Sequence, residues 1–380
     1  MNIAVNTRVL VPKLEGIGWF EYETLRRIVT QHPEHTFHFI FDRDYDERFL
    51  FADNVKPVLT FPPCRHHPYF WYVYFEWAIP YVLRKIKPDL FLSPDGWVSL
   101  RTEVPQVTVI HDINFAHHPE FFAPAFRKYF DEYFPKFAAK AVRIATVSEF
   151  SKSDICATYG VPADKVDVVY NGSNELFRPL DAGEKARVQV QYAHGCDYFL
   201  FVSAINKRKN LPNILRGFDR YKELSGSDVK FLVVGGRVGK QEELDEVLAN
   251  MKHTQDVRFL GHLPAKELAL VTGASIALVY ASLFEGFGIP IIEAYNAETA
   301  VITSNTTSMP EVAGVAAILV DPLSVEQISD AMVKLASDHL FRSQLIEKGR
   351  EQRQKFNWDI SAQKLWTCIE KALNNKLLSE

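Results

Sequence analysis

The most specific stretch of this sequence reads SLFEGFGIPIIEA at residues 282–294, directly after the apolar run 276–280. An apolar run, a glycine-rich turn and a helical segment in this order predict a strand–loop–helix unit of a parallel sheet. Pro290 suits the first turn of the helix, and Gly286 and Gly288 let backbone N–H groups approach a ligand. The start of this helix would therefore face an anion, ideally a pyrophosphate.

Two carboxylates flank these predicted anion donors. Glu285 would project from the loop, and Glu293 would lie about one turn inside the helix. One carboxylate can then accept hydrogen bonds from sugar hydroxyls and the other from ribose hydroxyls. Without the rest of the pattern, the same residues would form an ordinary glycine-rich turn with two surface glutamates.

Short apolar runs of the same kind recur along the chain, separated by longer amphipathic stretches. They lie at residues 3–5, 37–41, 89–92, 107–110, 143–147 and 166–170, and then at 198–202, 229–234, 257–260, 276–280, 300–303 and 317–320. The alternation predicts an α/β fold with two doubly wound, Rossmann-like domains. If the two sheets face each other, the loops at their strand ends surround a central cleft.

The domain boundaries follow from length and from loop composition. A length of 380 residues divided by about 150 gives two or three domains. A polar segment with Pro and Gly at 171–183 is typical of a linker, so we expect domains at 1–177 and 178–358. Residues 359–380 carry a helical apolar stripe, and we expect this C-terminal helix to pack back on the first domain.

Composition excludes several classes of protein. The 43 Lys and Arg residues nearly balance 47 Asp and Glu, so no excess of positive charge would recruit nucleic acid. The four cysteines lie far apart, which favours reduced thiols over a disulfide framework or a zinc site. With no signal peptide and no long apolar run in the sequence, we expect a cytoplasmic location, at the inner face of the membrane if the chain contacts one.

The segment at 282–294 resembles the E-x7-E signature of retaining, nucleotide-sugar-dependent glycosyltransferases of family 4, which have the GT-B fold. The resemblance implies that the first domain binds the acceptor and the second binds the donor. It implies that Glu285 orients the donor sugar and that Glu293 holds the ribose. It also places the backbone of 286–289 against the donor, through Gly286, Phe287, Gly288 and Ile289.

Further segments resemble the same family in the same order. Arg208 and Lys209 match the basic pair that neutralises the donor diphosphate, and His111 matches a histidine beside the donor sugar. Gly16 and Gly18 match the N-terminal glycine loop in part, because Glu15 stands where another glycine is common. The pair that resembles the segment lining the nucleotide base is His262 and Leu263. The implied catalytic residues are His111, Arg208, Lys209 and Glu285.

The resemblance implies a metal-independent hexosyltransferase that makes surface polysaccharide. GDP-mannose is favoured over UDP-glucose as the donor, and the acceptor is a glycan or a lipid-linked glycan. No cofactor is expected. Two alternatives remain open: a nucleotide-sugar epimerase of the same fold, and a catalytically silent protein that binds nucleotide sugars.

Two other regions admit a second interpretation. Residues 61–87 are rich in aromatics and end in basic residues, so they form either a core helix or a peripheral membrane contact of the first domain. Acidic residues at 42–46 have D-x-D spacing that could bind a divalent cation, but their position favours a solvated loop. The pairs His66-His67 and His117-His118 have no complete set of metal ligands around them, so no metal site is predicted.

Overall fold

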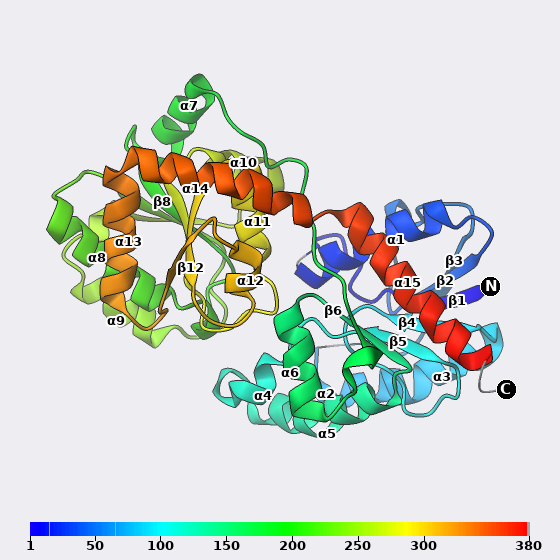
Figure 1. The fold of residues 1–380 in the computed structure, drawn as a ribbon. Coiled ribbons are helices and arrows are strands. Elements are labelled where there is room, and N and C mark those ends of the chain that lie inside the picture. The colour runs from blue at the N-terminus through cyan, green and yellow to red at the C-terminus, as the bar shows by residue number, and fades with distance from the viewer. Residues whose placement is uncertain (15, 65, 378–380) are drawn as a thin grey trace. The chain divides into compact units, whose positions relative to one another are not determined.

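The computed structural model describes residues 1–14, 16–64 and 66–377. The chain forms two compact units (Figure 1). Unit 1 contains Met1–Asn171 and the C-terminal helix α15 (Trp358–Leu377), and unit 2 contains Gly172–Phe356. Phe177 packs against Ala269 and Ala297 of unit 2, so the short segment before the expected boundary at 177 goes with the second unit.

Unit 1 is built on a seven-stranded sheet in the order β3-β2-β1-β4-β5-β6-β7. All its strand pairs are parallel. The strands are β1 (Asn2–Asn6), β2 (Thr36–Phe41), β3 (Val55–Leu59), β4 (Leu90–Ser93), β5 (Gln106–Val109), β6 (Arg143–Thr146) and β7 (Val166–Val168). The helices besides α15 are α1 (Gly16–Gln31), α2 (Pro68–Val73), α3 (Ile79–Ile86), α4 (Asn114–His117), α5 (Pro124–Lys140) and α6 (Glu149–Tyr159).

Unit 2 repeats this plan with a six-stranded sheet in the order β10-β9-β8-β11-β12-β13. Its strand pairs are parallel as well. The strands are β8 (Tyr198–Val202), β9 (Lys230–Val234), β10 (Val257–Gly261), β11 (Ala277–Tyr280), β12 (Ala300–Ser304) and β13 (Ile318–Val320). The helices are α7 (Ala182–Ala193), α8 (Leu211–Ser225), α9 (Glu242–Asn250), α10 (Ala265–Gly273), α11 (Ile289–Asn296), α12 (Met309–Ala313), α13 (Val325–Ser337) and α14 (His339–Gln352).

The predicted fold class, α/β with two doubly wound domains, is confirmed. Every predicted apolar run forms a strand, but no apolar run predicted β3. This strand lies at the edge of the sheet and contains Pro57, which has no N–H to donate. Its exposed positions also weaken the apolar pattern that identified the other strands.

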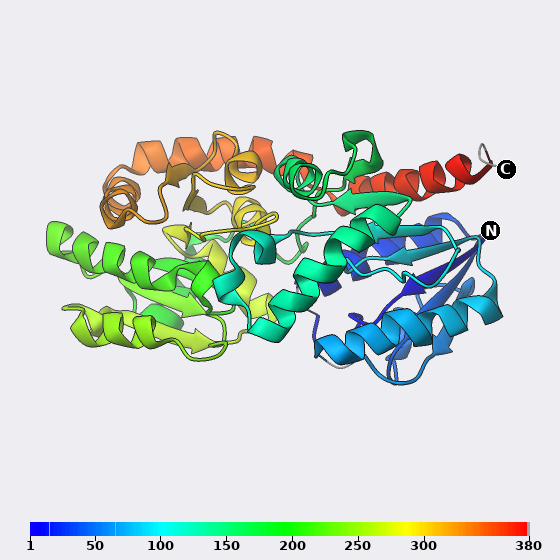
Figure 2. The ribbon, with the colours of Figure 1, turned by 90° about the horizontal axis from the view of Figure 1, so that it is seen from below.

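The helix α15 belongs to unit 1 and lies beside α1 (Figure 1). The indole ring of Trp366 stacks on the imidazole of His32 with 3.8 Å between ring centroids. Figure 2 shows the sheet of unit 1 between α15 and the helix formed by residues 68–86. Within the described residues, no helix combines the length and apolar character that a membrane crossing requires.

Candidate functional site

In both sheets the strand order changes direction once. The switch lies between β1 and β4 in unit 1 and between β8 and β11 in unit 2. Loops at the carboxyl ends of the two strands diverge at such a switch point, which is where ligands bind in doubly wound folds. In unit 2 the turn Lys207–Lys209 follows β8, and the loop that contains Glu285 follows β11. The predicted basic pair and the first predicted glutamate therefore meet at the switch point.

Arg208, Lys209 and Glu285 form one hydrogen-bonded cluster. Lys209 Nζ lies 2.5 Å from Glu285 Oε1, and Arg208 Nη1 lies 3.0 Å from Glu285 Oε2. Tyr280, the last residue of β11, donates its hydroxyl to Glu285 Oε1 at 2.9 Å and accepts a hydrogen bond from Lys209 Nζ at 2.8 Å. Both oxygens of the carboxylate are thus engaged, and two cations share a single acid.

The electrostatics of this cluster favour an ionised Glu285. Burial alone would raise the pKa of its carboxyl, but Arg208 and Lys209 outweigh burial and lower the pKa to about 2. Burial, followed by the negative charge of Glu285, raises the pKa of Tyr280 well above its ordinary value. At neutral pH the tyrosine is therefore a neutral donor, and the glutamate is a carboxylate.

A second loop fixes the backbone around Glu285. Ser308 donates its hydroxyl to the carbonyl oxygens of Glu285 at 2.8 Å and of Phe287 at 3.1 Å. Thr307, which has a left-handed φ of 56°, accepts a hydrogen bond from the Glu285 N–H at 3.3 Å. The sequence pattern gave no signal for Tyr280. Thr307 and Ser308 were not selected either, because serine and threonine before a proline are common in ordinary loops.

The predicted helix after the glycines is α11. It begins at Ile289 with Pro290 in its first turn, and its N-cap is Gly288, which has a φ of 103°. A glycine N-cap has no side chain to occupy the first N–H groups of a helix, so these groups suit an anionic ligand. A side chain at position 288 would also be strained at this φ.

Glu293 differs from Glu285 in its surroundings. It lies inside α11 and is partly exposed, and its carboxyl group has no hydrogen bond or ion pair with any of the described residues. Burial of the carboxyl raises its pKa to about 8. In the unliganded protein, Glu293 is therefore mainly protonated at neutral pH.

Three predicted residues of unit 1 lie at the carboxyl ends of its strands. His111 follows β5, donates a hydrogen bond from Nε2–H to the carbonyl oxygen of Pro94 at 2.9 Å, and packs edge-on against Phe20. Burial lowers the pKa of its imidazole, which makes the ring neutral at pH 7. Gly16 and Gly18 form the first turn of α1. A Cβ on Gly18 would lie 3.1 Å from the Val9 carbonyl oxygen, whereas Gly16 has open space around it.

The predicted pair His262 and Leu263 follows β10, with His262 exposed and Leu263 packed against an apolar cluster. Beside it, the structure reveals a glycine that the sequence analysis missed. Gly235, at the end of β9, has a φ of 135°, and a Cβ there would lie 1.8 Å from the Ser203 carbonyl oxygen. The run Val-Val-Gly-Gly at the end of a strand was the available signal.

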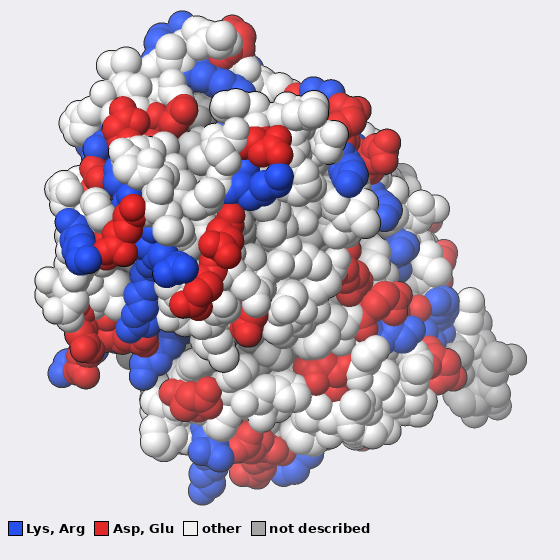
Figure 3. Space-filling view, turned by 60° about the vertical axis from the view of Figure 1, so that its left-hand side comes forward, with Lys and Arg blue, Asp and Glu red and all other residues white. Residues whose placement is uncertain are grey.

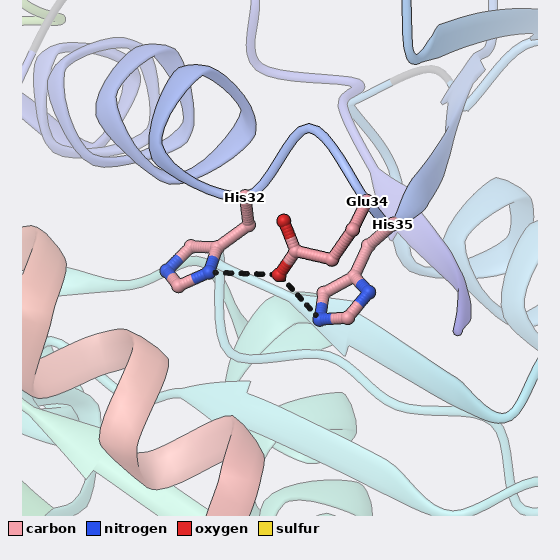
Figure 4. Close-up of side chains that lie close together, drawn as sticks. All are labelled: His32, Glu34 and His35. Atoms are coloured by element: carbon pink, nitrogen blue, oxygen red, sulfur yellow. Dashed lines mark ion pairs between the residues drawn. The ribbon is translucent and has the colours of Figure 1, made fainter.

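The described residues contain one group of three potential metal ligands, which the sequence analysis did not single out: His32, Glu34 and His35 (Figure 4). Glu34 Oε1 lies 3.5 Å from His32 Nδ1 and 3.2 Å from His35 Nε2. The group precedes β2, so it lies at the end of the sheet opposite to the switch-point loops.

The expectation of a solvated loop at residues 42–46 is wrong for Asp42, which is buried and bound by Arg43.

The charges at the surface are mixed in sign. On the face drawn in Figure 3, acidic and basic side chains alternate without a continuous patch of either sign. The net charge of −4 agrees with this distribution.

Two protein-family models match the chain. "Glycosyltransferase Family 4" matches residues 16–175, and "Glycosyl transferases group 1" matches residues 184–352. The first match lies almost entirely in unit 1 and the second lies in unit 2. The candidate cluster of Arg208, Lys209 and Glu285 falls inside the second match.

Relatives of known sequence and a solved structure agree with these matches. O-antigen chain mannosyltransferase B of Escherichia coli is 28% identical over 280 residues, 73% of either chain. O-antigen chain mannosyltransferase RfbU of Salmonella typhimurium is 28% identical over 304 residues, 76% of this chain and 80% of the relative. The structure of Anabaena HepE in complex with UDP and glucose has a TM-score of 0.75 at 16% identity, covering 98% of this chain and 100% of that one.

Proposed function

Because this chain belongs to the family 4 glycosyltransferases with the GT-B fold, we propose that it transfers mannose from GDP-mannose to a hydroxyl of a glycan or lipid-linked acceptor in surface polysaccharide synthesis. Glycosyl transfer itself is supported by both family models. Mannose as the sugar is supported by the names of the two O-antigen relatives. UDP-glucose is the rival donor, since HepE is a structural neighbour with UDP and glucose bound.

The observation that carries the proposal is the cluster at the unit 2 switch point. When the bond between the anomeric carbon and the diphosphate breaks, negative charge develops on the departing phosphate oxygen. Arg208 and Lys209 are fixed in place before this happens, so they can stabilise that charge without reorganising. These two cations supply the positive charge that a divalent metal would otherwise provide, and we propose that the reaction needs no metal.

We propose transfer with retention of configuration at the anomeric carbon. A double-displacement route needs a carboxylate free to attack, but both oxygens of Glu285 are engaged by Arg208, Lys209 and Tyr280. In the proposed front-face reaction, the acceptor oxygen bonds to the anomeric carbon on the side that the diphosphate leaves. The acceptor proton passes to the departing phosphate oxygen. Glu285 and His111 orient the donor sugar, and Glu293 accepts hydrogen bonds from the ribose.

A transfer assay tests the proposal. Purified protein is incubated with GDP-mannose or UDP-glucose and a panel of glycan acceptors, with and without EDTA, and product configuration is read by NMR. We expect transfer from one donor, with retention and no effect of EDTA. The variant Lys209→Ala should lower turnover by roughly 10²- to 10³-fold. Lys252→Ala, which removes an exposed lysine of the same unit, should not change it.

Other outcomes of this assay point to the alternatives. Conversion of the donor sugar to its epimer without acceptor would indicate an epimerase. Donor binding without any product would indicate a silent binding protein. Loss of activity with EDTA, restored by a divalent cation, would contradict the metal-independent proposal.

We further propose that residues 61–87 contact an anionic membrane surface. The helix in this region buries Trp71, Tyr74 and Phe75 but leaves Trp77 and Tyr81 more than half exposed. Cations accompany both exposed rings, because Arg101 lies 4.3 Å from the Trp77 ring centroid and Lys85 Nζ lies 4.4 Å from that of Tyr81. Exposed aromatic rings with adjacent cations are typical of protein surfaces that bind anionic membranes.

Vesicle binding tests this contact. Wild-type protein should cosediment with vesicles that contain anionic lipid and much less with purely zwitterionic ones. The double variant Trp77→Ala, Tyr81→Ala should lose most of this binding. Replacement of Leu319 and Leu323, exposed apolar residues of unit 2, by alanine provides the matched control. Equal binding by both double variants would contradict the proposal.

A further inference from the structure

Unit 1 contains an open pocket of about 530 Å³, a volume in the range of small-molecule sites. Its lining residues are Arg8, Arg43, Pro63, Cys64 and His66. Arg8 follows β1, Arg43 follows β2, and the other three residues follow β3. The pocket therefore lies at the carboxyl ends of three adjacent strands and next to the switch point of the sheet.

The two arginines reach the pocket, whereas their acidic partners lie behind it. Arg8 Nε is 2.5 Å from Asp95 Oδ2, and Arg43 binds Asp42 through Nε at 2.7 Å and Nη2 at 2.9 Å. Both aspartate side chains are only 1% exposed, and neither lines the pocket. A ligand would thus meet guanidinium N–H groups without meeting a carboxylate.

Part of each guanidinium group remains available to a ligand. Among the described residues, no oxygen accepts a hydrogen bond from either η nitrogen of Arg8, whose Nη1 lies 4.0 Å from Cys64 Sγ. Nη1 of Arg43 likewise has no partner among them, and this side chain is 53% exposed. A molecule in the pocket can therefore accept hydrogen bonds from both arginines.

Arg8 is held in position before any ligand binds. Its guanidinium lies 4.5 Å from the ring centroid of Trp97 and 5.7 Å from that of Phe75. Its partner Asp95 also accepts a hydrogen bond from Ser93 at 3.1 Å. Because little side-chain entropy remains to be lost on binding, such a donor binds its ligand more tightly than a mobile one.

We infer that this pocket binds a phosphate group of the acceptor substrate, an inference that rests on the proposed glycosyl transfer. A sugar hydroxyl needs both donors and acceptors around it, whereas a phosphate ester presents acceptors and suits a wall of guanidinium N–H groups. Two planar guanidinium groups can each bind a phosphate through paired hydrogen bonds. The phosphate belongs either to a lipid-linked acceptor or to a soluble sugar phosphate.

Calorimetric titration of the full chain tests this inference. The probes are inorganic phosphate, hexyl phosphate, and phosphatidylcholine vesicles with and without a polyprenyl phosphate. We expect at least one phosphate probe to bind, and Arg43→Gln to weaken that binding by about tenfold or more. Arg43→Lys, which keeps the charge but loses the planar group, should give an intermediate loss. Arg26→Gln, which removes an exposed arginine of α1, should bind like the wild type.

The probes distinguish the two sources of phosphate. Binding of hexyl phosphate in solution supports a soluble phosphorylated acceptor, and binding confined to vesicles with polyprenyl phosphate supports a lipid-linked one. Absence of binding to every phosphate probe would overturn the inference. Equal binding by wild type, Arg43→Gln and Arg43→Lys, all with unchanged thermal unfolding, would overturn it as well.

A parallel titration separates this inference from the proposed function. GDP and UDP are titrated into wild type, Lys209→Ala and Arg43→Gln. Nucleotide binding that is lost in Lys209→Ala and kept in Arg43→Gln reports on unit 2 alone. If no variant and no donor gives glycosyl transfer, the proposed function fails, whereas loss of phosphate binding in Arg43→Gln still identifies the pocket in unit 1.

Discussion

The two switch points use the same interaction in different ways. In unit 1 the ion pair Arg8–Asp95 joins the loops after β1 and β4, and in unit 2 the ion pair Lys209–Glu285 joins the loops after β8 and β11. The closest N–O distance is 2.5 Å in both. In unit 2, however, a second cation, Arg208, shares the same carboxylate, whereas Arg8 has an acid of its own.

The difference in charge indicates which ligand each site can bind. Two cations and one carboxylate leave a positive charge at the unit 2 switch point, which suits a nucleoside diphosphate. In unit 1 the positive and negative charges of the pairs Arg8–Asp95 and Arg43–Asp42 cancel. The pocket therefore offers directed hydrogen bonds without a surplus of charge. The first site should recognise charge, and the second should recognise the arrangement of acceptor oxygens.

The largest expected effect concerns stability. Arg8→Met would leave the buried Asp95 with Ser93 as its remaining hydrogen-bond partner, so we expect a loss of about 3–5 kcal/mol in the free energy of unfolding. Lys209→Met should cost less, because Arg208 still neutralises Glu285. Chemical denaturation of the two variants measures the difference. Equal losses would show that the sharing of Glu285 has no energetic consequence.

A second effect links donor binding to protons. The pKa of Glu293 is raised to about 8 in the unliganded protein, and hydrogen bonds from ribose would favour the carboxylate and lower it. Nucleotide binding between pH 6 and 7 should therefore release up to one proton, which calorimetry in buffers of different ionisation enthalpy detects. Glu293→Gln should bind nucleotide at least tenfold more weakly without this release. Glu347→Gln, at an exposed position, serves as control.

A third effect is the pH dependence of stability that the buried acid Glu21 of unit 1 causes. Glu21 is fully buried, both its carboxylate oxygens have no hydrogen-bond partner among the described residues, and burial raises its pKa well above the ordinary value. Its contribution to stability is therefore fully present below about pH 4.5 and is lost as the pH rises through its folded-state pKa. Glu21→Gln should remove this loss, so the variant should melt above wild type at pH 9. A melting temperature of Glu21→Gln below that of the wild type at pH 9 would contradict this prediction.

The smallest effect is on salt dependence. Raising the salt concentration from 50 to 500 mM should weaken nucleoside diphosphate binding in unit 2 more than phosphate binding in unit 1, because screening acts on a surplus charge. Titrations at several salt concentrations give the two slopes. Similar slopes would contradict the view that the unit 1 pocket is electrically balanced.

The sequence predicted both sheets and most of the unit 2 cluster because their signals are local. An apolar run identifies each central strand, and β11, Glu285, Gly288 and Pro290 lie in one continuous segment. Tyr280 and Ser308 were missed because their roles depend on where the side chains point after folding. Arg8 and Arg43 look ordinary in the sequence, and the D-x-D spacing at Asp42 gave no sign that this aspartate would be buried beside Arg43.

The amino-acid sequence alone identifies the family, the residues near Glu285, and the order of strands and helices apart from β3. Each of these is encoded by neighbouring residues, through hydrophobic periodicity or motif spacing. The pairing of the charges, in contrast, follows from the folded arrangement of the loops. The protonation of Glu285 and Glu21 depends on burial and on partners distant in sequence, whereas that of Glu293 depends on burial. The loops after β1, β2, β3 and β4 meet because parallel strands bring their carboxyl ends to one edge.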